Sequence, residues 1–482
     1  MRRVLIYGAG EAGVMVLEEI LKRPEEKIGV FGFVDDDPAK IGTRVRGVKV
    51  LGGKHTLVGW IRNFDINEII IAMPSIEKRA IREVVKVCKS EKVKLLIVPS
   101  TREIIEGTVR FDQIKSLDLA DLLDREEVRV DAGLIRASVE GKRVLVTGAA
   151  GSIGSVLVAE LLRYRPATVI ALDISENGLF YLMNRMKGAV ERGDTTLIPC
   201  VADVKERRIL EEVFALNLPH VVFHAAAYKH VPLMESHQRV ALLNNVVGCR
   251  NLLELSEETG VQRFVAISTD KAVHPISVMG KTKRICELLV GAFAARGLKA
   301  CSVRFGNVLG SNGSVITVFQ EQIARGGPIT ITSPSIERFF MTVAEATSLV
   351  LQAASIGEGG SIYVLDMGKP IKIKDLAENL IVLSGFTPEV DIKINYTGLR
   401  EGERLSETLF YDDCVVLPSG YAGIAIERPF VDYEEMLKRV QTLADSVYDL
   451  STEQMNEAVD SIVSCARFQS PRSIKLTAEA GI

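Results

Sequence analysis

A hydroxyl, a carboxylate and an amine stand side by side in the sequence at Thr269, Asp270 and Lys271. They follow the apolar run Phe264–Ile267, which predicts a buried strand. Open α/β folds bind ligands at the carboxyl ends of their parallel strands, so these side chains are placed for general acid–base chemistry. Lys271 can act as a base only if burial or a nearby cation lowers its pKa. The alternative is a strand-end salt bridge between Asp270 and a basic neighbour.

A glycine-rich turn lies between the predicted strand Arg143–Val146 and the predicted helix Ser155–Leu162. Glycines at three-residue spacing let the backbone turn tightly and approach a pyrophosphate, whose charge is stabilised at the helix N-terminus. The turn therefore predicts a dinucleotide site. The residues assigned to it are Gly148, Gly151, Ser152, Ile153 and Gly154.

Two acidic residues extend this predicted site. Asp173 ends the next strand, Val169–Leu172, where a carboxylate suits a free ribose 2′-hydroxyl and repels a 2′-phosphate. NAD is therefore favoured over NADP. Asp203, with Val204, follows another apolar strand and is placed to meet the adenine edge.

The same strand, glycine turn and helix also occur at the start of the chain. The run Val4–Tyr7 is followed by Gly8, Gly10 and Gly13, and Asp35 closes a second strand at Ile28–Val34. A single glycine pattern of this kind is weak evidence for a dinucleotide site. The N-terminal domain is therefore left with two alternatives, namely binding of a dinucleotide or a purely regulatory or assembly role.

The fold class predicted is α/β, with two Rossmann-like parallel-sheet domains in series and a small mixed α/β substrate-binding part toward the C-terminus. We expect an accessory domain over residues 1–135, a catalytic domain over 136–432 and a helical segment over 433–482. In the last segment, Glu434–Leu443 and Glu453–Val463 have amphipathic periodicity, and residues 470–482 read as a frayed tail.

Composition narrows the function classes. The 482 residues carry a formal net charge of −3 and no long basic run, which argues against nucleic-acid binding. The seven cysteines and six histidines show no metal-ligand spacing, so no metal is expected and the thiols should be reduced. No apolar stretch approaches the length of a membrane span. We therefore expect a soluble, cytoplasmic protein without direct membrane insertion.

Five segments resemble the polysaccharide-biosynthesis branch of the extended short-chain dehydrogenases/reductases. They are Thr147–Ser155, Phe223–Pro232, Ser268–Val273, Val303–Gly310 and Thr397–Glu403. The similarity covers most of residues 1–430 and is strongest to UDP-N-acetylglucosamine 4,6-dehydratases of the large type. Larger members of the branch carry transmembrane helices ahead of the accessory domain, so this chain is expected to be a soluble or truncated form.

The resemblance implies a reaction and roles for residues. A 4,6-dehydratase oxidises sugar C4, eliminates water across C5 and C6, and returns the hydride to C6. By resemblance, Asp270 protonates the departing C6 oxygen and Lys271 removes the C5 proton. Ala225 and Lys283 join the cofactor-binding residues, and a homo-oligomer is expected from family habit.

The sequence departs from the wider family at the usual Tyr-x-x-x-Lys pair. Lys283 is present, but Met279 occupies the tyrosine position and a thioether cannot accept a proton. The base for the C4 hydroxyl stays open among Thr269 acting through water, Asp270 and Tyr228. By resemblance, the large dehydratases that retain the C5 configuration also have methionine at this position. Retention of the C5 configuration is therefore favoured.

The sequence gives weaker signals for the substrate-binding residues than for the dinucleotide site. Arginine side chains offer planar, permanently charged forks for phosphate oxygens, and the glycine- and serine-rich segment Gly310–Val315 offers backbone N–H groups to a diphosphate. Asn245 matches a structural asparagine of the family. The predicted substrate-binding residues are Lys229, Asn307, Ser314, Arg338, Arg400 and Glu403.

Two rival functions remain. A UDP-sugar 4-epimerase shares the cofactor, the fold and the first hydride step, but it normally relies on the missing tyrosine. A non-catalytic dinucleotide sensor would have no reason to keep Lys283 together with the Thr269–Lys271 cluster.

Overall fold

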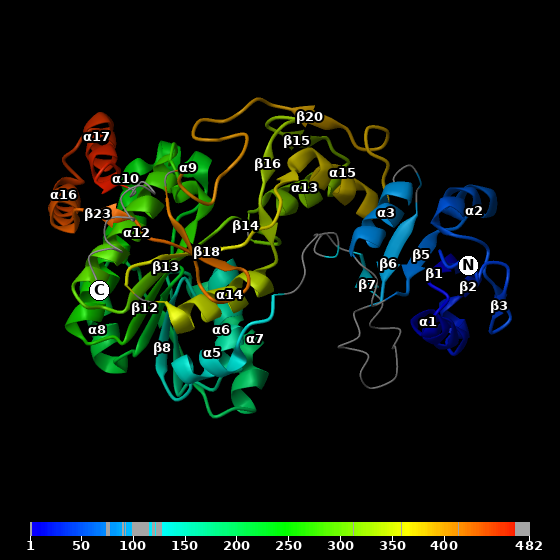
Figure 1. The fold of residues 1–482 in the computed structure, drawn as a ribbon, viewed down its shortest axis with the longest axis horizontal. Coiled ribbons are helices and arrows are strands. Elements are labelled where there is room, and N and C mark those ends of the chain that lie inside the picture. Colours follow the sequence, from blue (N-terminus) through cyan, green and yellow to red (C-terminus); the bar gives the residue numbers. More distant parts are fainter. Residues whose placement is uncertain are drawn as a thin grey trace, which may run out of the picture. The chain divides into compact units, whose positions relative to one another are not determined.

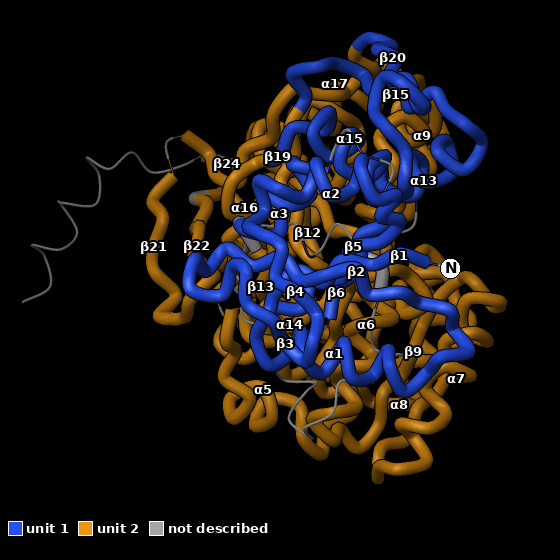
Figure 2. The backbone as a smooth tube through the Cα atoms, turned by 90° about the vertical axis from the view of Figure 1, so that its right-hand side faces the viewer, with its two compact units in different colours: residues 1–126, 313–336, 371–398 blue, residues 127–312, 337–370, 399–482 orange. Residues whose placement is uncertain are grey.

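A computed structural model describes residues 2–73, 78–88, 91, 93–98, 115–117, 121, 128–311, 313–357, 359–412 and 414–467. The chain forms two compact units, coloured separately in Figure 2. Unit 1 comprises Met1–Glu126, Gly313–Ile336 and Ile371–Gly398, and unit 2 comprises Glu127–Asn312, Glu337–Pro370 and Leu399–Ile482. Two segments from the range expected to form the catalytic domain thus group with the N-terminal residues.

Unit 1 contains a five-stranded sheet in the order β2-β1-β5-β6-β7, in which only β7 runs antiparallel to its neighbour. Its strands are β1 (Arg2–Tyr7), β2 (Ile28–Val34), β5 (Glu68–Ile71), β6 (Lys94–Ile97) and β7 (Lys115–Ser116). Its helices include α1 (Glu11–Leu21), α2 (Leu57–Phe64) and α3 (Lys78–Cys88). The later segments add α13 (Val315–Ala324), α15 (Ile373–Leu383) and the pair β15 (Ile329–Ile331) and β20 (Ile394–Tyr396).

Unit 2 is built on a nine-stranded sheet in the order β10-β9-β8-β11-β12-β13-β18-β22-β21. The strands from β10 to β18 are parallel, and β22 and β21 add an antiparallel edge. Their bounds are β8 (Arg143–Thr147), β9 (Thr168–Asp173), β10 (Thr196–Val201), β11 (Val221–His224), β12 (Arg263–Thr269), β13 (Ala300–Phe305), β18 (Ile362–Leu365), β21 (Val416–Pro418) and β22 (Ile424–Glu427).

Helices cover both faces of this sheet, as Figure 1 shows. One face packs against α5 (Ala132–Val139), α6 (Ser152–Leu162), α7 (Glu176–Glu191) and α14 (Val343–Ile356). The other packs against α8 (Arg207–Asn217), α11 (Gly248–Glu258), α12 (Val278–Ala295), α16 (Tyr433–Ser446) and α17 (Thr452–Val463). Both faces of the central strands are therefore buried, which explains their nearly continuous apolar sequences. The predicted α/β class with Rossmann-like parallel sheets is confirmed.

The two C-terminal helices are specified locally and by packing. Asp432 caps α16, and Ser451 with Gln454 forms a capping box at the start of α17. Met436 and Val459 belong to the same buried cluster as the side chains of α12. The amphipathic segments predicted at Glu434–Leu443 and Glu453–Val463 are thus helices. Residues 470–482 lie outside the described residues.

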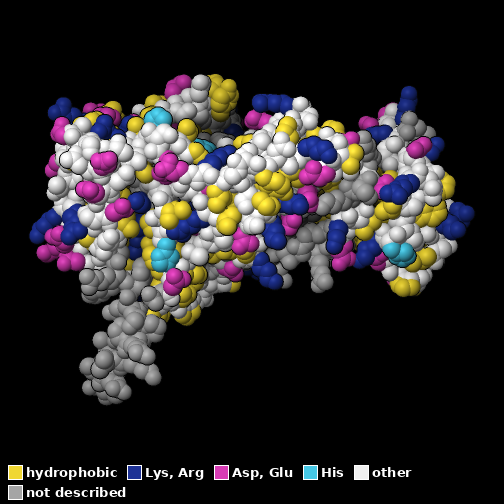
Figure 3. Space-filling view, turned by 90° about the horizontal axis from the view of Figure 1, so that it is seen from above, with side chains coloured by type: hydrophobic (Ala, Val, Ile, Leu, Met, Phe, Trp, Pro, Cys, Tyr) yellow, Lys and Arg dark blue, Asp and Glu magenta, His cyan; other side chains and the backbone are white. Residues whose placement is uncertain are grey.

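Charged side chains of both signs occur on the surface of the described residues. On the face drawn in Figure 3, Lys and Arg side chains are interspersed with Asp and Glu. Among the described residues, no helix has the length and hydropathy needed to cross a membrane, and no group of three or more metal-ligating side chains occurs.

Candidate functional site

Two glycines shape the turn between β8 and α6. Gly148 has a φ of +67°, and a Cβ added there would lie 2.6 Å from the backbone nitrogen of Ala226. A Cβ on Gly154 would lie 2.0 Å from the carbonyl oxygen of Gly148. α6 begins at Ser152, directly after the turn. The backbone thus forms a narrow cradle at a helix N-terminus, which is the arrangement that a pyrophosphate requires.

The carboxylate of Asp173 is fixed against this turn. Its Oδ2 accepts a hydrogen bond from the backbone N–H of Ala150 at 2.9 Å, and its Oδ1 accepts one from the N–H of Ser175 at 2.9 Å. Each oxygen keeps a second lone pair that can accept a ribose hydroxyl. Asp173 therefore has the position and the free acceptors expected of the ribose-binding carboxylate.

A cavity of about 210 Å³ lies at the carboxyl ends of β8, β9, β10 and β11. The predicted cofactor residues that line it are Gly148, Gly151, Asp173, Asp203, Val204 and Ala225. Of the other predicted residues, Ser152, Ile153 and Gly154 lie in the first turn of α6, and Lys283 lies on α12. Ala202, Ala226 and Asn244 also line the cavity. The two alanines carry no sequence signal of their own, and Asn244 is identified only by its position in the fold.

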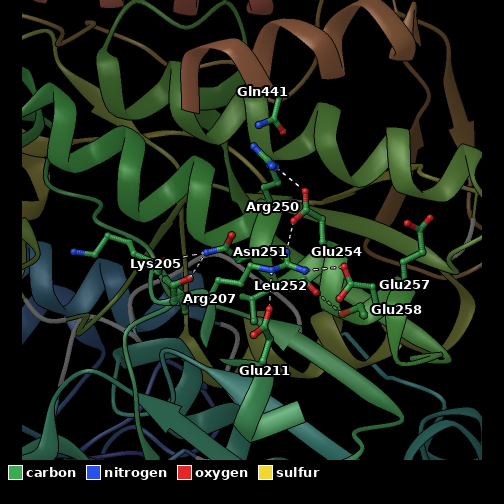
Figure 4. Close-up of polar contacts among 12 residues, drawn as sticks. Lys205, Arg207, Glu211, Arg250, Asn251, Leu252, Glu254, Glu257, Glu258 and Gln441 are labelled. Carbon is green, nitrogen blue, oxygen red and sulfur yellow. Dashed lines mark hydrogen bonds and ion pairs between the residues drawn. The ribbon is translucent and has the colours of Figure 1, made fainter. Parts of the chain in front are cut away.

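A side chain from α11 holds the loop that carries Asp203 and Val204, and ion pairs join α11 to α8 (Figure 4). Asn251 on α11 donates hydrogen bonds from Nδ2 to the carbonyl oxygens of Val204 and Lys205, both at 3.1 Å. Arg207, at the start of α8, forms ion pairs with three carboxylates, those of Glu211, Glu254 and Glu258. The predicted adenine-binding loop is thus held in place by α11.

The close approach at Gly154 gives a testable result. Gly154→Ala should weaken NAD binding by about tenfold or more, because an overpacked site of this kind costs about 1–3 kcal/mol. The measurement is NAD affinity by calorimetry. Gly188→Ala on α7 is the control, since the nearest atom to its added Cβ is 4.0 Å away, on Arg192. Unchanged affinity in Gly154→Ala would contradict the assigned cradle.

Thr269, Asp270 and Lys271 lie at the carboxyl end of β12. The Thr269 hydroxyl donates to Asp270 Oδ1 at 2.9 Å, and Lys271 Nζ donates to the same oxygen at 3.0 Å. Asp270 is fully buried, and its Oδ2 has no hydrogen-bond partner among the described residues. The alternative interpretation, a strand-end salt bridge between Asp270 and a basic neighbour, is thus also present, and the neighbour is Lys271.

Two further side chains complete the surroundings of Lys271. Its Nζ donates to Asn307 Oδ1 at 3.2 Å and lies 3.8 Å from Glu407 Oε1. Burial raises the pKa of Glu407, Lys271 opposes the shift and Asp270 adds to it. Asn307 was predicted as a substrate contact. Glu407 was not predicted at all, because it follows the Thr397–Glu403 motif and meets Lys271 only in the folded chain.

Met279 and Lys283 lie one turn apart on α12, so they share a helix face. Met279 is buried in a small apolar cluster with Met234, Ala241 and Val278, against which Tyr228 packs. Lys283 is buried, and its charge adds to the burial that lowers the pKa of His224 to about 3. Lys283 therefore lies near the end of β11, beside the loop that lines the cofactor cavity.

Asn245 connects this loop to α12. Its Oδ1 accepts from the backbone N–H of Tyr228 at 2.8 Å, and its Nδ2 donates to the Tyr228 carbonyl at 3.0 Å and to Thr282 Oγ1 at 2.9 Å. Asn245 lies within the π-helical turn η4 (Leu242–Val247). These hydrogen bonds hold the loop at Tyr228 against α12.

A buried charged network lies next to the turn formed by Thr269, Asp270 and Lys271. Arg304 donates to both carboxylate oxygens of Glu287, each at 2.9 Å, and to both oxygens of Glu427, at 2.7 and 3.0 Å. Ser268, just before the catalytic turn, donates to Glu287 Oε1 at 2.7 Å. The network therefore joins β12, β13, β22 and α12 beneath the site.

This network predicts an acid-sensitive contribution to stability. Burial by itself would raise the pKa of Glu287, but Arg304 and Arg284 lower it to about 2. An unfolded glutamate titrates near 4.3, so the stabilisation of about 3 kcal/mol is complete above that pH and is lost as the pH falls toward 2. We expect the free energy of unfolding, measured by denaturant titration, to fall less over this interval in Glu287→Gln than in wild type. Glu257→Gln, at a more exposed pair with Arg296, should keep the wild-type dependence.

The predicted substrate-binding residues have different local surroundings. Arg338 is 7% exposed and donates to the carbonyl oxygens of Glu337, Arg404 and Leu405, with Glu403 at 3.6 Å. Arg400 and Lys229 have exposed side chains. Ser314 belongs to unit 1, where it precedes α13. Phosphate contacts by these residues remain predictions. Arg338 also has a structural role, because it donates hydrogen bonds to three backbone carbonyl groups.

Known proteins share this architecture. A family model described as "Polysaccharide biosynthesis protein" matches residues 144–427, and one described as "CoA-binding domain" matches residues 1–99. The chain is 40% identical over 430 residues to the probable polysaccharide biosynthesis protein EpsC of Bacillus subtilis, covering 88% of this chain and 72% of EpsC.

Solved structures agree on the fold. A UDP-glucose 4-epimerase from Thermotoga maritima with UDP-glucose is 26% identical, with a TM-score of 0.50, over 56% of this chain and 90% of that one. A dTDP-glucose 4,6-dehydratase from Streptomyces venezuelae, with NAD bound, is 23% identical, with a TM-score of 0.51, over 63% of this chain and 97% of that one. The chain therefore belongs to the polysaccharide biosynthesis protein family, a group of extended short-chain dehydrogenases/reductases that modify nucleotide sugars.

Proposed function

We propose that the protein is an NAD-dependent dehydratase that converts UDP-N-acetylglucosamine to the UDP-4-keto-6-deoxy sugar. The observation that carries the proposal is the cluster at the end of β12, where Lys271 lies against Asp270, Asn307 and Glu407. A 4-epimerase leaves C5 and C6 untouched and has no need of an amine among carboxyl groups. A dehydratase needs both a base for C5 and an acid for C6.

The residues of the chain divide the work of this reaction. NAD, when bound, accepts hydride from C4 and returns it to C6. The glycine cradle and Asp173 hold the dinucleotide, and Lys283 lies beside the loop that lines its cavity. Lys271 removes the C5 proton, which the C4 ketone has made acidic. Met279 keeps the tyrosine position apolar, so the proton of the C4 hydroxyl passes to one of the open candidates, Thr269, Asp270 or Tyr228.

The test is incubation of the purified protein with UDP-N-acetylglucosamine in deuterated water. Mass spectrometry should show loss of one water, and proton NMR should show a 4-keto-6-methyl sugar with deuterium at C5. The C5 coupling reports retention, which Met279 favours. An isomeric UDP-N-acetylgalactosamine product would replace the proposal with the epimerase. No conversion and no transient reduction of bound NAD would favour the sensor.

The proposal includes the cytoplasmic location and the homo-oligomeric state that the resemblance implies. Cell fractionation tests the first, and light scattering of the purified protein tests the second.

A further inference from the structure

One carboxyl group beside the catalytic lysine has no role in the mechanism implied by the family. Glu407 lies 3.8 Å from Lys271 Nζ, and its side chain is only 6% exposed. Among the described residues, Lys271 is the one cation within ion-pair distance of its carboxylate. A nearly buried carboxyl group facing a single lysine is an arrangement in which a proton can move between the two partners.

Lys271 can act as a base only as a neutral amine. Its Nζ donates to Asp270 Oδ1 at 3.0 Å and to Asn307 Oδ1 at 3.2 Å. An ammonium that donates to these acceptors, with Glu407 beside it, has no lone pair for the C5 proton. Catalysis at C5 therefore requires a neighbour that takes a proton from Lys271.

Of the two carboxyl groups, Glu407 is the one that can take this proton. Asp270 Oδ1 already accepts from Thr269 and Lys271, and Asp270 Oδ2 is buried beneath Gly306, where an added Cβ would lie 3.1 Å from it. Burial raises the pKa of Glu407, and the charge of Asp270 adds to this against the effect of Lys271. Arg338 and Arg404 also act to lower this pKa, but burial outweighs them, so Glu407 holds a proton more readily than an ordinary glutamate.

We propose that Lys271 and Glu407 share one proton and act as an acid–base pair across the C5–C6 bond, with Glu407 in place of Asp270 as the acid for the departing C6 oxygen. This inference rests on the proposed dehydratase function. With the proton on Glu407, the lone pair of Lys271 takes the C5 proton. The C5–H electrons form the C5–C6 double bond while the C6–O bond breaks, and the departing oxygen takes the Glu407 proton and leaves as water.

The protons balance over the cycle. Elimination leaves an ammonium at Lys271 beside a carboxylate at Glu407. Lys271 returns its proton to C5 when hydride is returned to C6. The proton released earlier from the C4 hydroxyl replaces the one that left Glu407 with water. Because C5 and C6 are adjacent atoms, their acid and base must also be neighbours, as Lys271 and Glu407 are.

The test compares wild type and Glu407→Gln as full-length, NAD-loaded proteins with UDP-N-acetylglucosamine in deuterated water. Two readouts are taken together, namely the absorbance of reduced nicotinamide and the deuterium at C5 of the sugar. In Glu407→Gln we expect C4 oxidation to persist, so that reduced nicotinamide accumulates. Dehydrated product and C5 deuterium should fall by about 10²–10⁴-fold. Glu401→Gln, in the preceding loop and exposed, is the control and should match wild type.

The outcomes distinguish failure of the Lys271–Glu407 pair from failure of the proposed dehydratase function. A wild type that forms no dehydrated product overturns the dehydratase itself. A wild type that dehydrates while Glu407→Gln does so at the same rate overturns only the pair, as does an equal loss of C4 oxidation and C5 exchange with NAD retained. If Glu407→Gln does not retain NAD, Glu407→Ala with added formate decides. Return of C5 exchange supports the pair, and no return overturns it.

Discussion

Lys271→Met should lower the rate of dehydration by about 10²–10⁴-fold, the usual contribution of a general base, while the protein stays folded and NAD-bound. Methionine keeps the length of the side chain but has no amine to take the C5 proton. The substitution removes the hydrogen bonds from Lys271 Nζ to Asp270 and Asn307. Both partners keep other hydrogen bonds, Asp270 with the Thr269 hydroxyl and Asn307 through its backbone N–H to Phe339. The measurement is product formation by mass spectrometry alongside the absorbance of reduced nicotinamide.

The matched control is Lys281→Met on α12. Its side chain is 18% exposed, against 19% for Lys271, and it is paired with Asp460. Removing this amine should leave the reaction rate unchanged. A wild-type rate of C5 deuterium incorporation in Lys271→Met would show that another group is the base.

Arg304→Met should destabilise the protein by about 3–5 kcal/mol, because it leaves two buried carboxylates without their shared cation. The guanidinium makes bidentate contacts with both Glu287 and Glu427 and also donates to the Leu409 carbonyl at 2.8 Å. All three charged side chains are fully buried. The free energy of unfolding from denaturant titration measures the loss.

Arg439→Met supplies the comparison for this result. Arg439 pairs with Glu435 one turn away on the exposed face of α16, and pairs of this kind contribute about 0.3–0.5 kcal/mol. If Arg304→Met lost no more stability than Arg439→Met, the buried network would not be what holds β12, β13, β22 and α12 together.

The sequence was informative wherever local geometry alone determines structure. The strand Ile28–Val34 was predicted with its observed limits, because apolar periodicity depends only on neighbouring residues. The spacing of Gly148 and Gly154 likewise reports a contact between residues six positions apart. The cofactor side of the candidate site was therefore the easier half to predict.

The other half depends on contacts between distant segments, which a single sequence does not encode locally. Glu407 lies 136 positions beyond Lys271 in the chain (407 − 271) and reaches it only through the folded sheet. Arg338 has the fork that suits a phosphate, but its partners are carbonyl oxygens that no residue pattern reveals. Segments 313–336 and 371–398 group with unit 1 for the same reason, since chain order does not determine which residues pack together.

The π-turn η4 sets the rotational phase of α11. A π-turn holds one residue more than an α-turn, and each residue of a helix advances its side chains by about 100°. Asn245 stabilises the bulge from inside, with its amide bonded to Tyr228 and Thr282. Removing one residue there would rotate every later side chain of α11, and Asn251 would turn away from the carbonyls of Val204 and Lys205 that it holds. The extra residue in η4 is thus the reason that η4 and α11 together contact both the loop at Tyr228 and the loop at Val204 and Lys205.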